Sequence, residues 1–213
     1  MSVLSFPGKS SCRFRHVRAL NTTGSMQVRV PPPLRRDEWR LIPNGLSGFA
    51  NTWRYWDCMK PACSYPRQVN VRTPHALTCN IDGVTPLPQE SQGYACSNQQ
   101  PWVANRSNML SFGFVAFVAR AGMQRSCCTC LELKFADPRL RGKTMVVQVI
   151  NASAGPDFVE LAVPGGGVGF YNKCLPQWNA GPEWGKQYGG LGEKNTCWQL
   201  PQPLRGGCKC VTR

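Results

Sequence analysis

The sequence predicts an all-β, loop-rich domain closed by disulfide bonds. Glycine (21) and proline (18) are abundant among the 213 residues, and only 17% of the chain is charged. This composition suits a β protein with many turns better than a helical one. The twelve cysteines are even in number and scattered along the chain. They indicate a disulfide framework formed in an oxidising compartment.

The first 46 residues differ from the remainder. They carry eight Lys or Arg residues and two acidic ones, and they contain a run of three prolines at 31–33. A basic arm can bind nucleic acid or anionic surfaces, but this one lacks the interleaved aromatic residues of a stacking platform. We therefore expect residues 1–46 to be a disordered extension or a gene-model artefact, residues 47–213 to form the folded domain, and no nucleic-acid partner.

Sequence signals favour a secreted protein that is not embedded in a membrane. No apolar run is long enough to span a bilayer. The short apolar stretch at residues 1–7 ends too soon to be a clear signal peptide. N-glycosylation sequons, which fit secretion, begin at Asn21, Asn105 and Asn151.

Two cysteine groups, at 127–130 and 208–210, raise the alternative of a zinc site. Their spacing is not C-x2-C, and both histidines of the chain lie far away in the sequence. We therefore expect disulfide pairing, no metal and no other cofactor. Cys79 and Cys96 are placed to close a loop.

Four apolar or alternating runs predict strands of a barrel or sandwich. They cover residues 111–119, 130–135, 144–150 and 158–163. In the last run, Val159, Leu161 and Val163 fall on one face and Glu160 falls on the other. Three consecutive glycines follow at 165–167. They allow the backbone to approach other backbone or a ligand closely, and the absence of a following Lys-Ser/Thr argues against a phosphate loop.

A carboxylate among aromatic residues is the strongest functional signal. Asp57 is accompanied by Trp53, Tyr55 and Trp56, with cysteines at 58 and 63. Aromatic faces bind sugar rings, and glycoside hydrolysis needs a carboxylate as base or nucleophile. The alternative is a solvated aspartate in a disulfide-rich turn.

The chain has only eleven acidic residues, so its catalytic candidates can be compared one by one. Most lie in the N-terminal extension, in turns or in polar loops. The best functional set is Asp57, Asp157 and Glu160. With only two histidines, a Ser-His-Asp system is not supported.

Several blocks of the chain, taken in order, resemble glycoside hydrolase family 45. The resemblance implies a secreted, monomeric endo-β-1,4-glucanase that acts on β-1,4-glucan and has a six-stranded double-psi β-barrel, a fold shared with expansins. The blocks are TWRYWDCMKPAC, FGFVAF, CCTC, LRGKTMVVQV, VPGGGVGFYNKC and QYGGL.

The resemblance also assigns residue roles. It implies an inverting mechanism in which Asp57 is the general base and Glu160 the general acid, with Asp157 as an alternative acid at a less suitable offset. Tyr55 would lie against the sugar at the scissile bond, and Tyr65 falls where the family often has a stacking tryptophan. Trp53 and Trp56 complete the predicted substrate-binding set.

The chain departs from the family pattern at several positions. Met59 replaces one cysteine of a Cys-Cys pair, and Glu160 stands where the family has aspartate. The family also continues past Cys208 through another strand and two more cysteines. We therefore expect Cys128 and Cys130 to lack their usual partners and the barrel to be truncated at its C-terminus. The alternative function is a non-hydrolytic, expansin-like wall-binding or loosening protein, or an inactive relative of the hydrolases.

Overall fold

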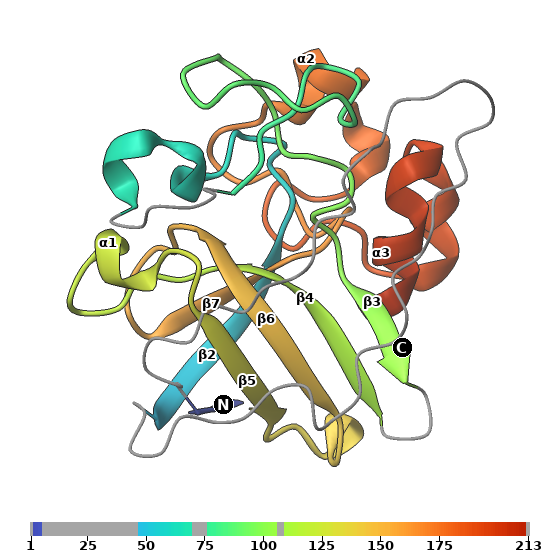
Figure 1. Ribbon diagram of the computed structural model, residues 1–213. Coiled ribbons are helices and arrows are strands. Elements are labelled where there is room, and N and C mark those ends of the chain that lie inside the picture. The colour runs from blue at the N-terminus through green and yellow to red at the C-terminus, as the bar shows by residue number, and fades with distance from the viewer. Residues whose placement is uncertain (1, 6–46, 70–75, 106–108, 212–213) are drawn as a thin grey trace.

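The structure is a computed structural model that describes residues 2–5, 47–69, 76–105 and 109–211 (Figure 1). Seven strands form one sheet in this part of the chain. They are β1 (Ser2–Ser5), β2 (Ser47–Tyr55), β3 (Trp102–Asn105), β4 (Leu110–Ala116), β5 (Cys130–Phe135), β6 (Thr144–Asn151) and β7 (Phe158–Ala162). The four predicted strands are confirmed as β4 to β7, with small differences at their ends.

The sheet curls so that its strands form a closed circuit. The order is β3-β4-β6-β5-β1-β2-β7, and β4 also pairs with β7. The pairs β4–β6 and β2–β7 are parallel, and the other pairs are antiparallel. Six strands therefore complete the circuit and β3 flanks it. This curled, strand-based domain confirms the all-β prediction, whereas the double-psi connectivity stays a prediction.

The start of the chain takes part in the sheet. The sequence prediction places residues 1–46 outside the folded domain, but residues 2–5 form β1. This strand pairs antiparallel with β2 on one side and with β5 on the other. It therefore fills the position between β2 and β5 that the circuit needs. Residues 6–46 of the expected extension lie outside the described residues.

The helices of the described chain are short and lie outside the sheet (Figure 1). None of those described is long and apolar enough to cross a membrane. The α-helices are α1 (Met123–Ser126), α2 (Cys174–Trp178) and α3 (Arg205–Val211). The 3-10 helices are Ala62–Ser64, Pro66–Gln68, Pro138–Leu140, Pro182–Trp184, Lys194–Gln199 and Gln202–Leu204.

Two apolar clusters make up most of the core. The larger one is built on β4 to β7 and includes Val159, Leu161 and Val163, which confirms the face predicted for that strand. The second cluster joins Trp56 to the C-terminal segment around Trp184 and Leu200. Burial of such side chains contributes about 1.5–3 kcal/mol each. Trp56, which directly follows β2, is thus packed into the core of the C-terminal half.

Four disulfides link described cysteines. They are Cys58–Cys174, Cys63–Cys127, Cys79–Cys96 and Cys197–Cys208. Cys130 is also disulfide-bonded, and Cys128 is a free thiol, which agrees with the expectation that Cys128 lacks its usual partner. Among the described residues, no group of three or more His, Cys, Asp or Glu side chains is arranged to hold a metal ion.

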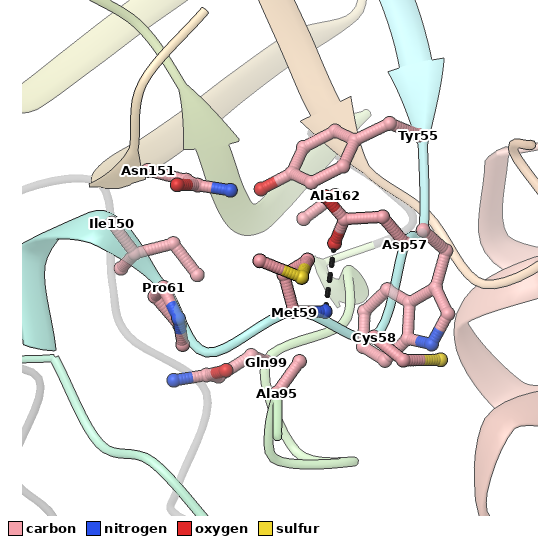
Figure 2. Close-up of a pocket in the computed structure, with 11 residues that line it drawn as sticks. Tyr55, Asp57, Cys58, Met59, Pro61, Ala95, Gln99, Ile150, Asn151 and Ala162 are labelled. Atoms are coloured by element: carbon pink, nitrogen blue, oxygen red, sulfur yellow. Dashed lines mark hydrogen bonds between the residues drawn. The ribbon is translucent and has the colours of Figure 1, made fainter. Parts of the chain in front are cut away.

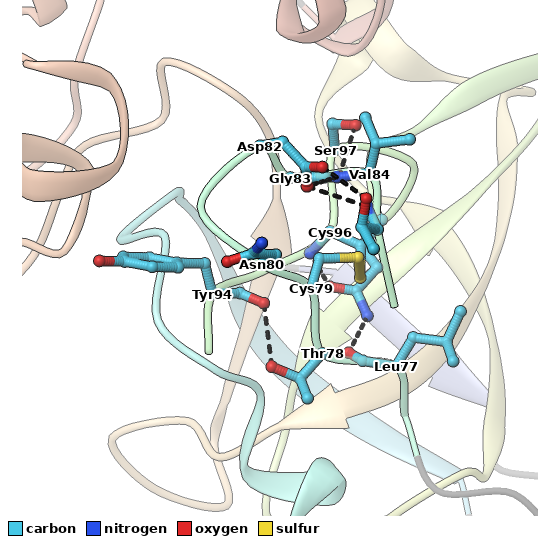
Figure 3. The surroundings of a disulfide bond; sticks show 12 residues. Leu77, Thr78, Cys79, Asn80, Asp82, Gly83, Val84, Tyr94, Cys96 and Ser97 are labelled. Carbon is cyan, nitrogen blue, oxygen red and sulfur yellow. Dashed lines mark hydrogen bonds between the residues drawn. A yellow bond between two sulfur atoms is a disulfide. The ribbon is translucent and has the colours of Figure 1, made fainter. Parts of the chain in front are cut away.

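The predicted Cys79–Cys96 bridge closes the loop between these two residues (Figure 3). The loop is also held by hydrogen bonds, because the Thr78 hydroxyl donates to the Tyr94 carbonyl oxygen at 3.2 Å. Tyr94 in turn forms a β-bridge with Met59. The position where the family has a second cysteine is therefore tied to this loop by backbone contacts.

Candidate active site

Asp57 lies just beyond the end of β2, and its backbone is fixed on two sides. Its carbonyl oxygen accepts a hydrogen bond from the Lys173 N–H at 2.9 Å. The neighbouring Cys58 has a positive φ of 59° and is bonded to Cys174. On the other side, the Trp56 N–H donates to the Gly167 carbonyl oxygen at 2.7 Å. Backbone bonds and a disulfide thus set the direction of the Asp57 carboxylate.

The Asp57 carboxyl is held in an environment that favours its protonated form. Its pKa is raised to about 6, mainly by burial and to a smaller extent by the charge of Glu160. The Met59 N–H donates to Oδ1 of Asp57 at 3.0 Å and opposes this rise. A carboxyl with such a pKa exchanges its proton near neutral pH, as a catalytic base requires.

Glu160 comes from β7, the parallel neighbour of β2. It stands in register with Trp53 of β2 and with Ala116 of β4. Its Oε1 accepts a hydrogen bond from the Ala154 N–H at 3.2 Å. Burial raises the pKa of this carboxyl, and that hydrogen bond lowers it. The fold therefore places Glu160 on β7 and Asp57 just beyond the end of its parallel neighbour β2.

Tyr55 and Asn151 line the pocket that contains Asp57 (Figure 2). Burial raises the pKa of the Tyr55 hydroxyl far above its ordinary value, and the charges of Asp57 and Glu160 add to this. The Asn151 side-chain amide lies beside that hydroxyl, with its nitrogen facing it (Figure 2). A glycan acceptor needs a side chain that is free to react, whereas the Asn151 side chain lines the pocket. The sequon that begins at Asn151 therefore no longer supports secretion.

Sequence analysis therefore missed Asn151 as a site residue. One signal was present, because Asn151 is the polar residue that ends the apolar strand β6. The contact partner that gives it a role, however, comes from β2 and is far away in the sequence.

The ring of Tyr65 lies against the ammonium group of Lys60, a buried residue. The Lys60 ammonium lies 4.3 Å from the centre of the Tyr65 ring. It also donates to the carbonyl oxygens of Gln89 and Ser91, although Lys60 itself is only 6% exposed. Cation–ring contacts of this kind contribute about 0.5–2 kcal/mol. Sequence analysis did not single out Lys60, which fixes the ring while leaving Tyr65 39% exposed.

The two tryptophans of the predicted substrate-binding set have different environments. Trp53 is 55% exposed and meets Phe158 edge to face at a ring separation of 5.6 Å. Trp56 is only 3% exposed and packs in the C-terminal cluster. Little of its ring is open to a sugar, although Trp56 is among the residues that line the pocket, and its part in substrate binding stays a prediction. Its position one residue past β2 turns it into the core.

Asp157 lies outside the pocket. Its side chain is 67% exposed and forms an ion pair with Arg120 at 3.6 Å. Its backbone carbonyl oxygen accepts a hydrogen bond from the Asn51 N–H at 2.9 Å, which helps to hold β7 beside β2. The structure thus separates Asp157 from the two carboxylates that it brings together.

The glycine run allows close backbone packing, as predicted. A Cβ atom at Gly166 would lie 2.8 Å from the Tyr55 nitrogen, and one at Gly190 would lie 2.0 Å from the Gly165 carbonyl oxygen. Both are closer than real Cβ atoms come to other atoms. The 165–169 turn therefore fits directly against β2 and against the 185–191 turn, which also receives hydrogen bonds from Arg54.

The chain is similar to known endoglucanases. The chain is 37% identical to an endoglucanase of Cryptopygus antarcticus over 179 residues, which cover 78% of each protein. It is 38% identical to an endoglucanase of Phaedon cochleariae over 201 residues, covering 88% of this chain and 80% of that one.

Its fold matches the crystal structure of the cellulase from the Antarctic springtail Cryptopygus antarcticus. The TM-score is 0.67 at 37% identity, and the match covers 74% of this chain and 79% of the other. Residues 47–212 match the model of glycosyl hydrolase family 45. The chain belongs to glycosyl hydrolase family 45.

Proposed function

We propose that the protein is an inverting endo-β-1,4-glucanase that hydrolyses internal bonds of cellulose or related β-glucans. The observation that carries the proposal is that the Asp57 carboxyl lines a pocket just beyond the end of β2, with Glu160 on β7, the parallel neighbour of β2. The endoglucanases among its relatives support the substrate class. The disulfide framework supports secretion, and we expect a monomer.

In this mechanism, Asp57 is the general base. Its ionised carboxylate removes a proton from a water molecule as the water oxygen attacks the anomeric carbon. Glu160 is the general acid and gives its proton to the glycosidic oxygen as the bond to the leaving sugar breaks. An inverting pair needs its carboxyl groups about 6.5–9.5 Å apart, so that water fits beneath the sugar. Inversion follows because the water attacks the face opposite the leaving group.

The exposed aromatic rings bind the glucan chain on either side of the reacting bond. Tyr65 offers the ring face that is not covered by Lys60, and Trp53 is open to solvent next to Glu160 in the strand register. Tyr55 reaches into the pocket at Asp57. Asp157 has no part in the proposed chemistry, because its carboxylate is exposed and paired with Arg120.

Hydrolysis of soluble carboxymethylcellulose tests the proposal. We expect a fast fall in viscosity relative to the release of reducing ends, which indicates internal cleavage. Proton NMR of the first products of cellohexaose should show the α-anomer. If the first products were the β-anomer, the inverting mechanism would be contradicted. If the folded protein released no product, the proposal that it is a hydrolase would be contradicted.

The expansin-like alternative predicts binding without hydrolysis, and the glutamate at position 160 is the feature that favours it. A pull-down on cellulose beside the activity assay separates the two functions. Glu160→Asp adds a second criterion within the same experiment, because it withdraws the carboxyl by about one carbon–carbon bond. Errors of about 1 Å in catalytic placement can cost 10²-fold. A site adapted to glutamate should therefore lose activity, whereas an abandoned acid should show no change.

The pH dependence of hydrolysis should reflect the raised pKa of Asp57. Since burial raises that pKa to about 6, the base is protonated and inactive below this value. We expect the limb of the kcat/KM profile that follows ionisation of Asp57 to have its midpoint at about pH 6. Steady-state rates on carboxymethylcellulose between pH 3 and 9 would measure the profile. A rise with its midpoint near the ordinary value for aspartate, about 3.9, would contradict this environment for Asp57.

A further inference from the structure

We propose that Asn151 is a positioning residue that directs the hydroxyl proton of Tyr55 into the active-site pocket, toward a sugar oxygen. The inference rests on the proposed function and adds to it a residue that controls which way a donor points. It follows from counting the donors and acceptors around the Asn151 side chain (Figure 2).

The Asn151 amide has one orientation because its oxygen is fully used. Oδ1 accepts a hydrogen bond from the Ala62 N–H at 3.0 Å and another from the Ala152 N–H at 3.0 Å. A carbonyl oxygen has two lone pairs, so no acceptor site remains on it. Turning the amide over would place two N–H groups against NH2. The side-chain nitrogen is therefore on the side that faces the pocket.

That nitrogen faces the Tyr55 hydroxyl (Figure 2). An amide NH2 group donates and cannot accept. Toward this neighbour the Tyr55 oxygen can therefore act only as an acceptor, so its own proton points elsewhere. The remaining space around the hydroxyl is the pocket shared with Asp57.

The Tyr55 proton stays in place over the working pH range. Burial and the charges of Asp57 and Glu160 raise the pKa of this hydroxyl far above its ordinary value. The group is thus a permanent, neutral donor. Asn151 is itself held firmly, because its backbone oxygen accepts the Phe117 N–H at 2.9 Å. A donor that is aimed before substrate arrives costs no reorganisation when charge develops.

The variant Asn151→Asp isolates the donor function. Aspartate keeps an oxygen for the N–H groups of Ala62 and Ala152, but it replaces the NH2 group by a second acceptor. The Tyr55 hydroxyl then turns its proton toward that acceptor and away from the sugar. We expect kcat on cellohexaose to fall about 10–100-fold, within the range seen when one aimed donor is lost, while the melting temperature changes little.

The added charge of Asn151→Asp is controlled by a double-mutant cycle with Tyr55→Phe. If Asn151 acts through the Tyr55 hydroxyl, Asn151→Asp should lower kcat no more than about threefold once that hydroxyl is gone, because residues that act as a unit are not additive. If Asn151→Asp lowered kcat by the same factor in the wild type and in Tyr55→Phe, the proposal would be overturned. The role of Asn151 would then be only to accept hydrogen bonds from backbone N–H groups.

The same four proteins should be titrated with cellohexaose by calorimetry, which needs no turnover. We expect a non-additive loss of affinity in this cycle as well, and additive losses would overturn the proposal. Absence of hydrolysis in the wild type, with cellohexaose bound, would contradict the proposed function but not the role of Asn151. The two failures are therefore distinguishable.

Discussion

Replacing Asp57 by asparagine should lower kcat on carboxymethylcellulose about 10²–10⁴-fold, the usual contribution of a general base. Asparagine keeps an oxygen that can accept the Met59 N–H, which donates to Asp57 at 3.0 Å, but it cannot remove a proton from water. Reducing-sugar release and cellohexaose affinity should be measured together, because a lost base lowers kcat while binding is retained.

Asp157→Asn is the matched control, because it makes the same chemical change on an exposed carboxylate paired with Arg120. It should keep at least about half of the activity, since exposed ion pairs contribute only about 0–1 kcal/mol to stability. If Asp157→Asn were as inactive as Asp57→Asn, the assignment of the pocket would be wrong.

Thermal unfolding excludes the possibility that Asp57→Asn is inactive because it is unfolded. The pKa of Asp57 rises from 3.8 to about 6 in the folded state, so folding favours the protonated form. The stability from this preference is present below pH 3.8 and is lost as pH rises through about 6. At pH 7 the charged carboxylate therefore destabilises the fold, by up to about 3 kcal/mol at 1.36 kcal/mol per pKa unit. The variant should melt at a higher temperature than the wild type at pH 7, and this difference should shrink at pH 4.

Removing the Cys58–Cys174 disulfide with two serines should lower the free energy of unfolding by about 2–5 kcal/mol, the usual cost of losing a native bridge. The two cysteines are 116 residues apart in sequence, and Cys58 adjoins Asp57. We therefore expect reduced activity even under conditions where the variant is folded. Denaturant unfolding and activity at a low temperature measure the two effects.

The Cys79–Cys96 bridge provides the comparison. It closes a sequence separation of only 17 residues, and a shorter loop gains less from cross-linking, about 3 against about 5 kcal/mol in the chain-entropy model. Its removal should cost less stability and should leave more activity in the folded protein. If removal of Cys79–Cys96 cost more stability and activity than removal of Cys58–Cys174, the Cys58–Cys174 bridge would not be what holds Asp57 in place.

The sequence revealed the strands whose burial follows a simple pattern and missed the others. β6 is almost continuously buried and β7 alternates, so periodicity identified both. β2 has only one fully buried position among nine, and its aromatic residues suggested a functional cluster instead of a strand. β1 was missed because its place depends on pairing with β2 and β5, which lie far away in the sequence.

The candidate site was predictable where chemistry is carried by single residues. Asp57 and Glu160 were found by comparing the acidic residues and by resemblance to the family. Sequence alone does not show that the chain turns the ring of Trp56 into the C-terminal cluster. Asn151 was missed because its role depends on Tyr55 of β2, which lies far away in the sequence.

The glycine turns at 165–169 and 185–191 also limit how this enzyme can be modified by mutation. They locate Tyr55 and Asp57 through main-chain contacts, with no room for a Cβ atom at Gly166 or Gly190. A library of variants at these glycines would return almost only the parent residue. The exposed rings of Trp53 and Tyr65 carry no such restriction. In laboratory evolution toward other glucans, substitutions should therefore accumulate at the exposed rings that contact the glucan. The backbone that carries Tyr55 and Asp57 should stay unchanged.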